Sequence, residues 1–278
     1  MIRVHVGIYA HVSEFDHSVE GDARVIDQSD IEYLLAQIDP THRDHMSRLI
    51  GQIPQGRLRL IFPLLTTIDP QALENRLGLG EPPESYRDIA RYLQTLIADG
   101  DRIQIGVGEP SSLMVKLGAF DEKNDLGMHT ELIAPGTAGL VQKGILTGKN
   151  KNQSPGIVVA AAWTGGSDDD FAIINDNPAF QLFDPEFILD VRRIADDDRQ
   201  VAINNALSVD LTGQINSESV FGARMINGTG GQPENHIGAF RSKGGKAITL
   251  LPSTALDGVV SRIVPQLEAG SLPINSDI

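Results

Sequence analysis

The sequence predicts an α/β protein with an open, largely parallel sheet flanked by helices. Between Tyr86 and Leu267, apolar stretches of strand length alternate with helical stretches, which is the order found in parallel α/β sheets. Several strand stretches are apolar throughout, as expected for strands buried on both faces. A sharp glycine turn, Gly106–Gly108, follows the first of them and supports a strand–turn–helix unit.

The expected elements begin with an amphipathic helix over 85–100, which carries Ile89, Leu93 and Leu96 on one stripe. A strand over 102–107 follows, and Pro110 then opens a second helix. Further helices are expected over 136–146, 167–177 and 183–195, further strands over 126–131, 156–165, 201–209 and 246–251, and a last apolar segment over 259–267.

The chain of 278 residues is long enough for one large domain or two smaller ones. The glycine- and proline-rich stretch Gly78–Ser85 has the composition of a linker. We therefore expect a shortened N-terminal α/β region over 1–82 and a larger domain over 83–278. In the first region, helices are expected over 29–50 and a strand over 57–65.

The composition excludes several classes of function. A formal net charge of −14 argues against nucleic-acid and anionic-membrane partners, because both require a basic surface. The absence of cysteine excludes disulfides and thiolate catalysis. His5, His11 and His17 fit no ligand spacing, so no metal site is expected. Without an apolar run of roughly 18 residues or a signal peptide, a cytoplasmic location is expected.

Glu131 is placed at the carboxyl end of an expected strand, the edge where ligands bind in open α/β sheets. Two glycine turns, Gly106–Gly108 and Asn227–Gln232, expose backbone N–H groups that suit a phosphate or an oxyanion. Taken alone, the two clusters are better explained as tight turns that need positive φ. Asn204 and Asn205 interrupt an apolar strand, which indicates either a structural polar network or a ligand site.

Sequence blocks across Tyr86–Leu267 resemble, in order and spacing, the acetyl-CoA hydrolase/transferase family, which includes acetate and 4-hydroxybutyrate CoA-transferases. The blocks are GDRIQIGVGEP, DLGMHTEL, VAINNALSVDLTGQINSESV, MINGTGGQPENHIGAFRSKGGKAITLLPSTA and SRIVPQL.

This resemblance implies a CoA-transferase-like fold and a ping-pong reaction between an acyl-CoA and a small carboxylic acid, without a permanently bound cofactor. Glu131 of the His-Thr-Glu block takes the position of the nucleophile that forms a glutamyl-CoA thioester. The implied oxyanion and CoA-binding residues are Gly106, Gly108, Gly230, Gly231 and Gln232. The implied lining residues are Glu109, His129, Asp190, Asn204, Asn205 and Lys243, the last a candidate for CoA phosphates.

The chain also departs from the family pattern. Glu234-Asn235 replaces a common Asp-Phe after the second glycine turn, Asp190 replaces an asparagine that assists in acetate-type members, and Glu109 replaces a small residue. Extra carboxylates would make it costlier to bring in a carboxylate substrate.

The ends of the chain differ from the family as well. Family members carry a full N-terminal domain and a further C-terminal segment, and their active site lies between two domains. The shorter ends here imply a partner subunit, a remodelled pocket or a lost activity. A CoA-transferase, or its catalytic subunit in a homo- or hetero-oligomer, is therefore the leading hypothesis. An acyl-CoA hydrolase and a non-catalytic CoA-binding or structural subunit are the alternatives.

Overall fold

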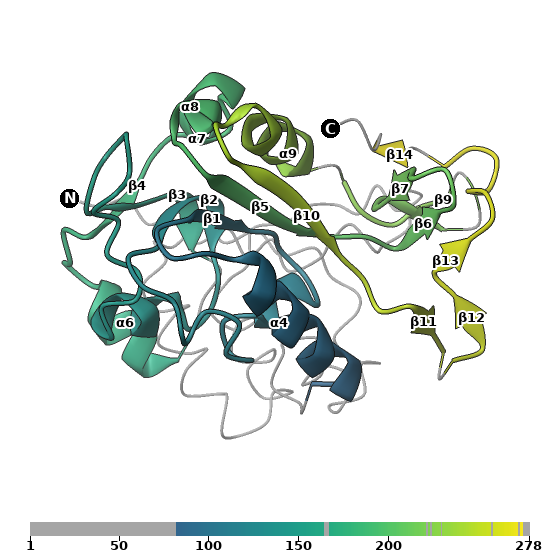
Figure 1. Cartoon of the computed structure of the whole chain (residues 1–278), viewed down its shortest axis with the longest axis horizontal. Helices are drawn as coiled ribbons and strands as arrows, with labels where there is room; N and C mark the ends of the chain where they lie inside the picture. Colours follow the sequence, from purple (N-terminus) through teal and green to yellow (C-terminus); the bar gives the residue numbers. More distant parts are fainter. Residues whose placement is uncertain are drawn as a thin grey trace, which may run out of the picture. The chain divides into compact units, whose positions relative to one another are not determined.

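The computed structural model describes most of the chain from Pro82 onward (Figure 1). The described residues are 82–163, 167–220, 222, 224–228, 230–256, 258–271 and 273–274. The three N-terminal histidines and the helices and strand expected before the linker lie outside this part of the chain. The division into regions 1–82 and 83–278 therefore stays a prediction.

The centre of the described chain is a six-stranded sheet with the order β10-β5-β1-β2-β3-β4. Every pairing within it is parallel, which confirms the predicted α/β class. Its strands are β1 (Arg102–Ile105), β2 (Gly127–Ile133), β3 (Val158–Trp163), β4 (Phe180–Leu182), β5 (Gln200–Asn205) and β10 (Lys246–Leu250).

The strand order reverses at β1. From β1 the chain proceeds outward through β2, β3 and β4, and it then returns to place β5 on the other side of β1. The carboxyl ends of β1 and β5 therefore border a topological switch point, where the connecting loops diverge and leave room for a ligand.

Helices cover both faces of the sheet (Figure 1). On one face, Ala90 and Leu93 of α4 (Glu84–Leu96) join the apolar core with Ile103 and Ile105 of β1. The other face is covered by α7 (Pro185–Ile188), α8 (Val191–Asp196) and α9 (Gln232–Arg241). The described chain also has α5 (Thr137–Gln142) and α6 (Asp168–Ile174), which contact each other.

The two faces differ in polarity because side chains alternate along each strand. Ile103 and Ile105 face the apolar core, whereas Gln104, between them, bonds to Asn204 of β5 on the face that α7, α8 and α9 cover. His129 and Glu131 of β2 also point to that second face, where they meet Ile188 and Gly231. The polar residues of the sheet thus gather under one layer of helices.

Short strands extend beyond the carboxyl ends of β5 and β10 (Figure 1). β13 (Ile263–Val264), β6 (Ser208–Asp210), β7 (Ile215–Asn216) and β14 (Pro273–Ile274) form a four-stranded sheet in that order. β8 (Ser219–Val220) pairs with β9 (Arg224–Met225), and β11 (Thr254–Ala255) with β12 (Val260–Ser261). None of the helices in the described residues has the length and hydropathy that a bilayer crossing requires.

Three expected elements are wrong in extent. The helix expected after Pro110 is a single 3₁₀ turn, η2 (Ser111–Leu113). The helix expected over 183–195 is two helices, because Asp190 caps the start of α8. The strand expected over 201–209 ends at Asn205, and β6 then begins a separate sheet at Ser208.

Candidate active site

Glu131 lies near the carboxyl end of β2, and its half-buried carboxylate meets the start of α9. Its Oε2 accepts a hydrogen bond of 3.0 Å from the backbone N–H of Gly231, the residue that precedes the first turn of α9. The first N–H groups of a helix have no partner within the helix, and together with the helix dipole they favour a negative charge. The carboxylate is therefore held and partly stabilised at a helix N-terminus.

Position 231 requires glycine because neighbouring side chains pack closely against its Cα. Its φ of −89° is accessible to any residue. A Cβ at this position, however, would lie 2.5 Å from Oε2 of Glu131 and 2.6 Å from Cδ2 of Leu189. The preceding Gly230 has a φ of +54°, a conformation that favours glycine. The second glycine turn thus uses one glycine for its backbone angle and the next for contact with Glu131.

The surroundings of Glu131 raise its pKa above the ordinary value for a glutamate. Burial is the largest cause, because it disfavours the charged form. The hydrogen bond from Gly231 acts in the opposite direction, and the negative charge of Glu234 raises the pKa further. The result is a carboxylate that is fixed in position but more basic than one in water.

The first glycine turn is held in place by Asn205, at the end of β5. The Asn205 side chain accepts a 2.9 Å hydrogen bond from the N–H of Ser111 and donates one of 2.9 Å to the carbonyl of Val107. Ser111 Oγ in turn donates to the carbonyl of Gly106 at 2.7 Å. The carboxyl ends of β1 and β5 are thereby tied together at the switch point.

Gly106 and Gly108 have different roles in this turn. The N–H of Gly106 continues the sheet by donating to the carbonyl of Ile203 at 2.7 Å. A Cβ on Gly106 would overlap Oδ1 of Asn204. Gly108 has a φ of +85°, which favours glycine for the turn itself. The contacts of Gly106 thus serve packing and strand pairing, and its expected oxyanion or CoA-binding role stays a prediction.

Asn204 belongs to a structural network. It is 5% exposed, and its side chain exchanges hydrogen bonds of 3.2 and 3.0 Å with Gln104 of β1. The polar residues Asp210 and Gln214, farther along the chain, bond to each other in a turn of the small sheet. These bonds give Asn204 a place in a structural network, and its expected role in lining a site stays a prediction.

Gln232 links the two glycine turns. Its Nε2 lies 3.4 Å from the carbonyl oxygen of Asn205, so the start of α9 adjoins the end of β5. The structure therefore brings Glu131, Gly231, Gln232 and Asn205 to one edge of the sheet, as parallel strands require for residues at their carboxyl ends.

His129 and Asp190 have partners of their own near this edge. His129 is 3% exposed, and its Nε2 lies 2.8 Å from the carbonyl oxygen of Ile188, at the end of α7. Burial lowers its pKa, which favours a neutral ring that donates to this carbonyl. The carboxylate of Asp190 accepts a hydrogen bond of 2.9 Å from the N–H of Arg192 as the cap of α8. Contacts with α7 and α8 thus account for the positions of both side chains.

Lys243 lies at the opposite edge of the sheet. Its carbonyl accepts a 2.9 Å hydrogen bond from the N–H of Arg199, the residue before β5 begins. Glu131, by contrast, lies toward the carboxyl ends of the strands, and a role of Lys243 in binding CoA phosphates stays a prediction.

Glu109 is exposed on the loop that follows β1. Desolvation raises the pKa of its carboxyl, and a hydrogen bond with Tyr86 of α4 lowers it. The Tyr86 pKa is raised mainly by burial and then by the charge of Glu109, while the charge of Arg262 lowers it. Sequence reasoning identified neither Tyr86, which bonds to Glu109, nor Leu189, which lies against Gly231, because each is brought there from a distant segment.

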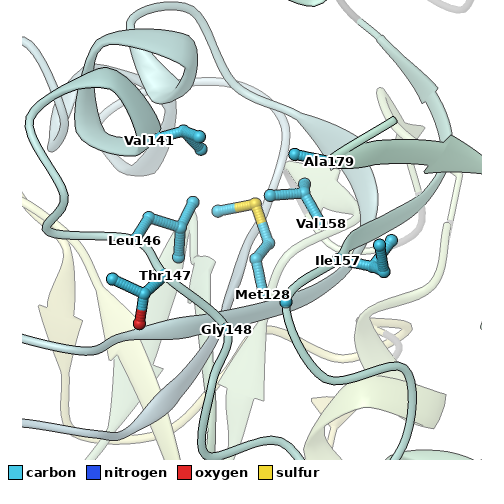
Figure 2. Close-up of a pocket in the computed structure, with 9 residues that line it drawn as sticks. Met128, Val141, Leu146, Thr147, Gly148, Ile157, Val158 and Ala179 are labelled. Carbon is cyan, nitrogen blue, oxygen red and sulfur yellow. The ribbon is translucent and has the colours of Figure 1, made fainter. Parts of the chain in front are cut away.

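A cavity of about 190 Å³ has a lining that does not include Glu131 (Figure 2). The lining residues include Met128, near the amino end of β2, and Val158, the first residue of β3. Val141 of α5 and Leu146, which follows that helix, also line the cavity. None of the predicted site residues lines this cavity. Within the described ranges, no cluster of three or more histidine, aspartate or glutamate residues is arranged to hold a metal ion.

Together, these features define an open, parallel α/β domain that presents a glutamate, held at a helix N-terminus, next to a topological switch point. Residues 166–276 match the family model described as acetyl-CoA hydrolase/transferase C-terminal domain. The predicted resemblance to the acetyl-CoA hydrolase/transferase family is confirmed by this match and by the relatives below.

Curated relatives agree with this assignment. The chain is 38% identical over 195 residues to the 4-hydroxybutyrate coenzyme A transferase of Clostridium kluyveri, a match that covers 69% of this chain and 44% of the relative. It is 30% identical over 232 residues to the butyryl-CoA:acetate CoA-transferase of Anaerostipes caccae, covering 82% of this chain and 52% of the relative. The chain thus spans about half the length of these relatives.

Solved structures confirm the fold. RipA from Yersinia pestis superposes with a TM-score of 0.64 at 34% identity, over 69% of this chain and 43% of RipA. The 4-hydroxybutyrate CoA-transferase from Porphyromonas gingivalis gives a TM-score of 0.57 at 35% identity, over 67% of this chain and 43% of that protein. The CoA-transferase-like fold predicted for the described domain is therefore confirmed.

Proposed function

We propose that the chain functions as an acyl-CoA:carboxylate CoA-transferase, or as its catalytic subunit, with Glu131 as the nucleophile. The observation that carries this proposal is the half-buried Glu131 carboxylate, fixed by the N–H of Gly231 at 3.0 Å. The names of the relatives, all acyl-CoA-dependent transferases, support the same reaction class. An acyl-CoA and a small carboxylic acid are the proposed substrates.

The proposed reaction proceeds through two covalent forms of Glu131. A carboxylate oxygen attacks the thioester carbonyl, the new C–O bond forms, the C–S bond breaks, and CoA leaves as a thiolate. The thiolate then attacks the glutamyl carbonyl of the resulting anhydride, which releases the original acid and leaves a glutamyl-CoA thioester. The acceptor carboxylate repeats these steps in reverse order. Each exchange is split into easier displacements by the covalent intermediates.

The Gly231 N–H supports the second of these displacements in particular. When a thiolate attacks the glutamyl carbonyl, negative charge develops on an oxygen of Glu131 itself. That oxygen is already within hydrogen-bonding distance of Gly231. A fixed backbone donor of this kind is typically worth about 2.7–4 kcal/mol in the transition state.

The proposal is tested by trapping the intermediate. The purified chain is incubated in turn with acetyl-CoA, propionyl-CoA and butyryl-CoA, and the intact mass and its peptides are measured. A mass increase equal to CoA minus water on Glu131, removed by hydroxylamine and absent from Glu131→Gln, is expected. Absence of the adduct with all three substrates, while CoA still binds by calorimetry, would support the non-catalytic CoA-binding subunit instead.

A second assay separates transfer from hydrolysis. Release of free CoA thiol from acetyl-CoA is followed with and without succinate, and formation of succinyl-CoA is followed at the same time. A transferase forms succinyl-CoA without net thiol release. Acceptor-independent thiol release would assign the chain as an acyl-CoA hydrolase.

The assembly is also a proposal. A homo- or hetero-oligomer is proposed, and light scattering on the purified chain, with and without acyl-CoA, measures the mass of the species that carries the Glu131 adduct. A monomer that carries the adduct would contradict a required oligomer.

A further inference from the structure

The first turn of α9 contains two carboxylates where a helix usually uses one. Glu234 is the third residue of α9, the position from which a glutamate commonly reaches back to the N–H of the capping residue. Here that N–H belongs to Gly231, and it is already donated to Glu131 at 3.0 Å. α9 accordingly has no side-chain cap of its own.

Glu234 is left without this partner. Its Oε2 is buried, and none of the described residues donates a hydrogen bond to it. A buried carboxylate oxygen that makes no hydrogen bond has lost its hydration without compensation. Glu131, 100 residues away from Gly231 in the sequence, thus occupies the place that the local sequence provides for Glu234.

The shared donor cannot turn away to relieve this competition. The carbonyl of Gly231 accepts hydrogen bonds from the Asn235 side chain at 2.7 Å and from the Asn235 N–H at 3.1 Å. Asn235 is fully buried, so the orientation of Gly231 is fixed by the helix. The two carboxylates therefore compete for one rigid helix N-terminus.

We propose that Glu234 is a positioning residue that competes with Glu131 for the N-terminus of α9 and thereby destabilises the Glu131 carboxylate relative to its acylated form. This inference rests on the proposed role of Glu131 as nucleophile. Acylation removes the negative charge of Glu131, so the repulsion between the two groups disappears when the covalent intermediate forms. The charge of Glu234 thus favours the thioester without touching the substrate.

The other titratable groups around Glu131 do not supply this charge. His129, two residues earlier on the same face of β2, has its pKa lowered by burial and lies against the carbonyl of Ile188. His236 on α9 is 1% exposed, and burial lowers its pKa to about 4, so its ring is neutral at neutral pH. Asp190, at the start of α8, directs its carboxylate to the N–H of Arg192. Glu234 raises the pKa of Glu131, in agreement with the competition.

The test measures the ionisation of Glu131 directly. The full chain is labelled with glutamate carrying ¹³C in the side-chain carboxyl, and the Glu131 resonance is assigned by its absence from Glu131→Gln. In Glu234→Gln the pKa of Glu131 is expected to fall, because the repulsion is gone. Glu234→Asp keeps the charge and is expected to leave the pKa of Glu131 closer to that of the wild type. Glu122→Gln, which removes an exposed charge elsewhere, is the matched control and should leave the titration unchanged.

The same variants are then incubated with acyl-CoA at pH values from 5 to 9. In Glu234→Gln, the fraction of chain that carries the Glu131 adduct at equilibrium is expected to fall several-fold, and the pH profile of adduct formation is expected to move to lower pH. Glu234→Asp is expected to recover much of the adduct. A purely structural role for Glu234 would change thermal stability without moving the pH profile.

The two proposals fail in different ways. An unchanged or higher pKa of Glu131 in Glu234→Gln overturns the competition, even if the wild type forms the adduct normally. A lower pKa together with no adduct in the wild type upholds the competition and overturns the role of Glu131 as nucleophile. If Glu234→Gln does not fold, Glu234→Ala replaces it. An unchanged Glu131 pKa in Glu234→Ala overturns the inference. So does a fall of the Glu131 pKa in Glu234→Asp that is as large as the fall in Glu234→Ala.

Discussion

At the scale of single residues, one contact controls the site, because Gly231 provides both a donor and the space that Glu131 fills. An added methyl group would displace the carboxylate while the rest of α9 stays in place. Side chains that overlap cannot both keep their positions in a closely packed interior.

Gly231→Ala is expected to reduce the rate of Glu131 adduct formation by about 100-fold or more, which is the typical effect of losing one fixed donor. The new Cβ would lie 2.5 Å from Glu131 Oε2, so the hydrogen bond cannot keep its geometry. The rate is measured by quenched mass spectrometry after mixing with acyl-CoA.

Gly228→Ala is the matched control for this substitution. Gly228 belongs to the same glycine cluster, but a Cβ there would meet nothing within 4 Å. Its adduct rate should stay within about two-fold of the wild type. Equal losses in both variants would mean that flexibility of the turn matters, and not the contact between Gly231 and Glu131.

At the scale of elements, the site depends on how the loop after β1 is fastened to β5. Two hydrogen bonds of the Asn205 side chain link Ser111 and Val107 to the end of β5. These bonds join segments that are 94 and 98 residues apart. The loop therefore takes its position from a neighbouring strand, beyond what its own sequence specifies.

Asn205→Ala is expected to lower the free energy of unfolding by about 1–3 kcal/mol, since it leaves a backbone donor and acceptor without their partner. Adduct formation at Glu131 should slow as well, because the loop borders the same edge of the sheet. Urea unfolding followed by circular dichroism measures the first effect. Gln181→Ala, on the exposed strand β4, is the control and should change the free energy by less than about 0.5 kcal/mol. A similar loss in both variants would contradict a specific role for Asn205.

The elements that the sequence predicted well are those with clear periodicity. α4 and the strands of the parallel sheet have strong apolar patterns, and their class and order could be read directly. α9 was not predicted, because its buried side includes Asn235 and His236, so the apolar stripe of an ordinary surface helix is missing. The sequence pattern does not reveal the break between α7 and α8, because nothing local shows that Asp190 caps a new helix instead of continuing the first one.

The candidate site was predictable in part. The sequence placed Glu131 at a strand end and identified the glycine-rich turn that contains Gly231, because both carry local signals. Leu189 and Asn235, which pack around Gly231, have no such signal. Their roles come from the packing of α9 against α8 and β5, which depends on contacts between distant segments.

At the scale of the whole molecule, the two edges of the sheet have different tasks. The amino edge carries Asp101, which is 1% exposed and forms ion pairs with Arg199 at 2.6 Å and Lys246 at 3.6 Å. These residues adjoin the starts of β1, β5 and β10. The carboxyl edge carries Glu131 and the glycine turns.

Asp101→Ala is expected to lower the free energy of unfolding by about 1–3 kcal/mol, because the N–H of Ala98 and the guanidinium of Arg199 lose the buried carboxylate that accepts their hydrogen bonds. The fraction of folded chain that forms the Glu131 adduct should remain unchanged, since the two edges are separated by the length of the strands. Chemical denaturation and adduct mass spectrometry are measured on the same preparation. Loss of the adduct in protein that remains folded would show that the two edges are coupled.

The hydrogen bond between Gly231 and Glu131 also links the two halves of the sheet on either side of β1, where the strand order reverses. β2 belongs to the half of the sheet that comes first in the sequence. α9 leads into β10, the outer strand of the half that comes last in the sequence. The proposed nucleophile therefore takes its position only when α9 has packed onto the sheet. A nascent or partly unfolded chain that contains β2 but lacks α9 would hold an ordinary solvated carboxylate, so reactivity toward thioesters becomes a marker of completed folding.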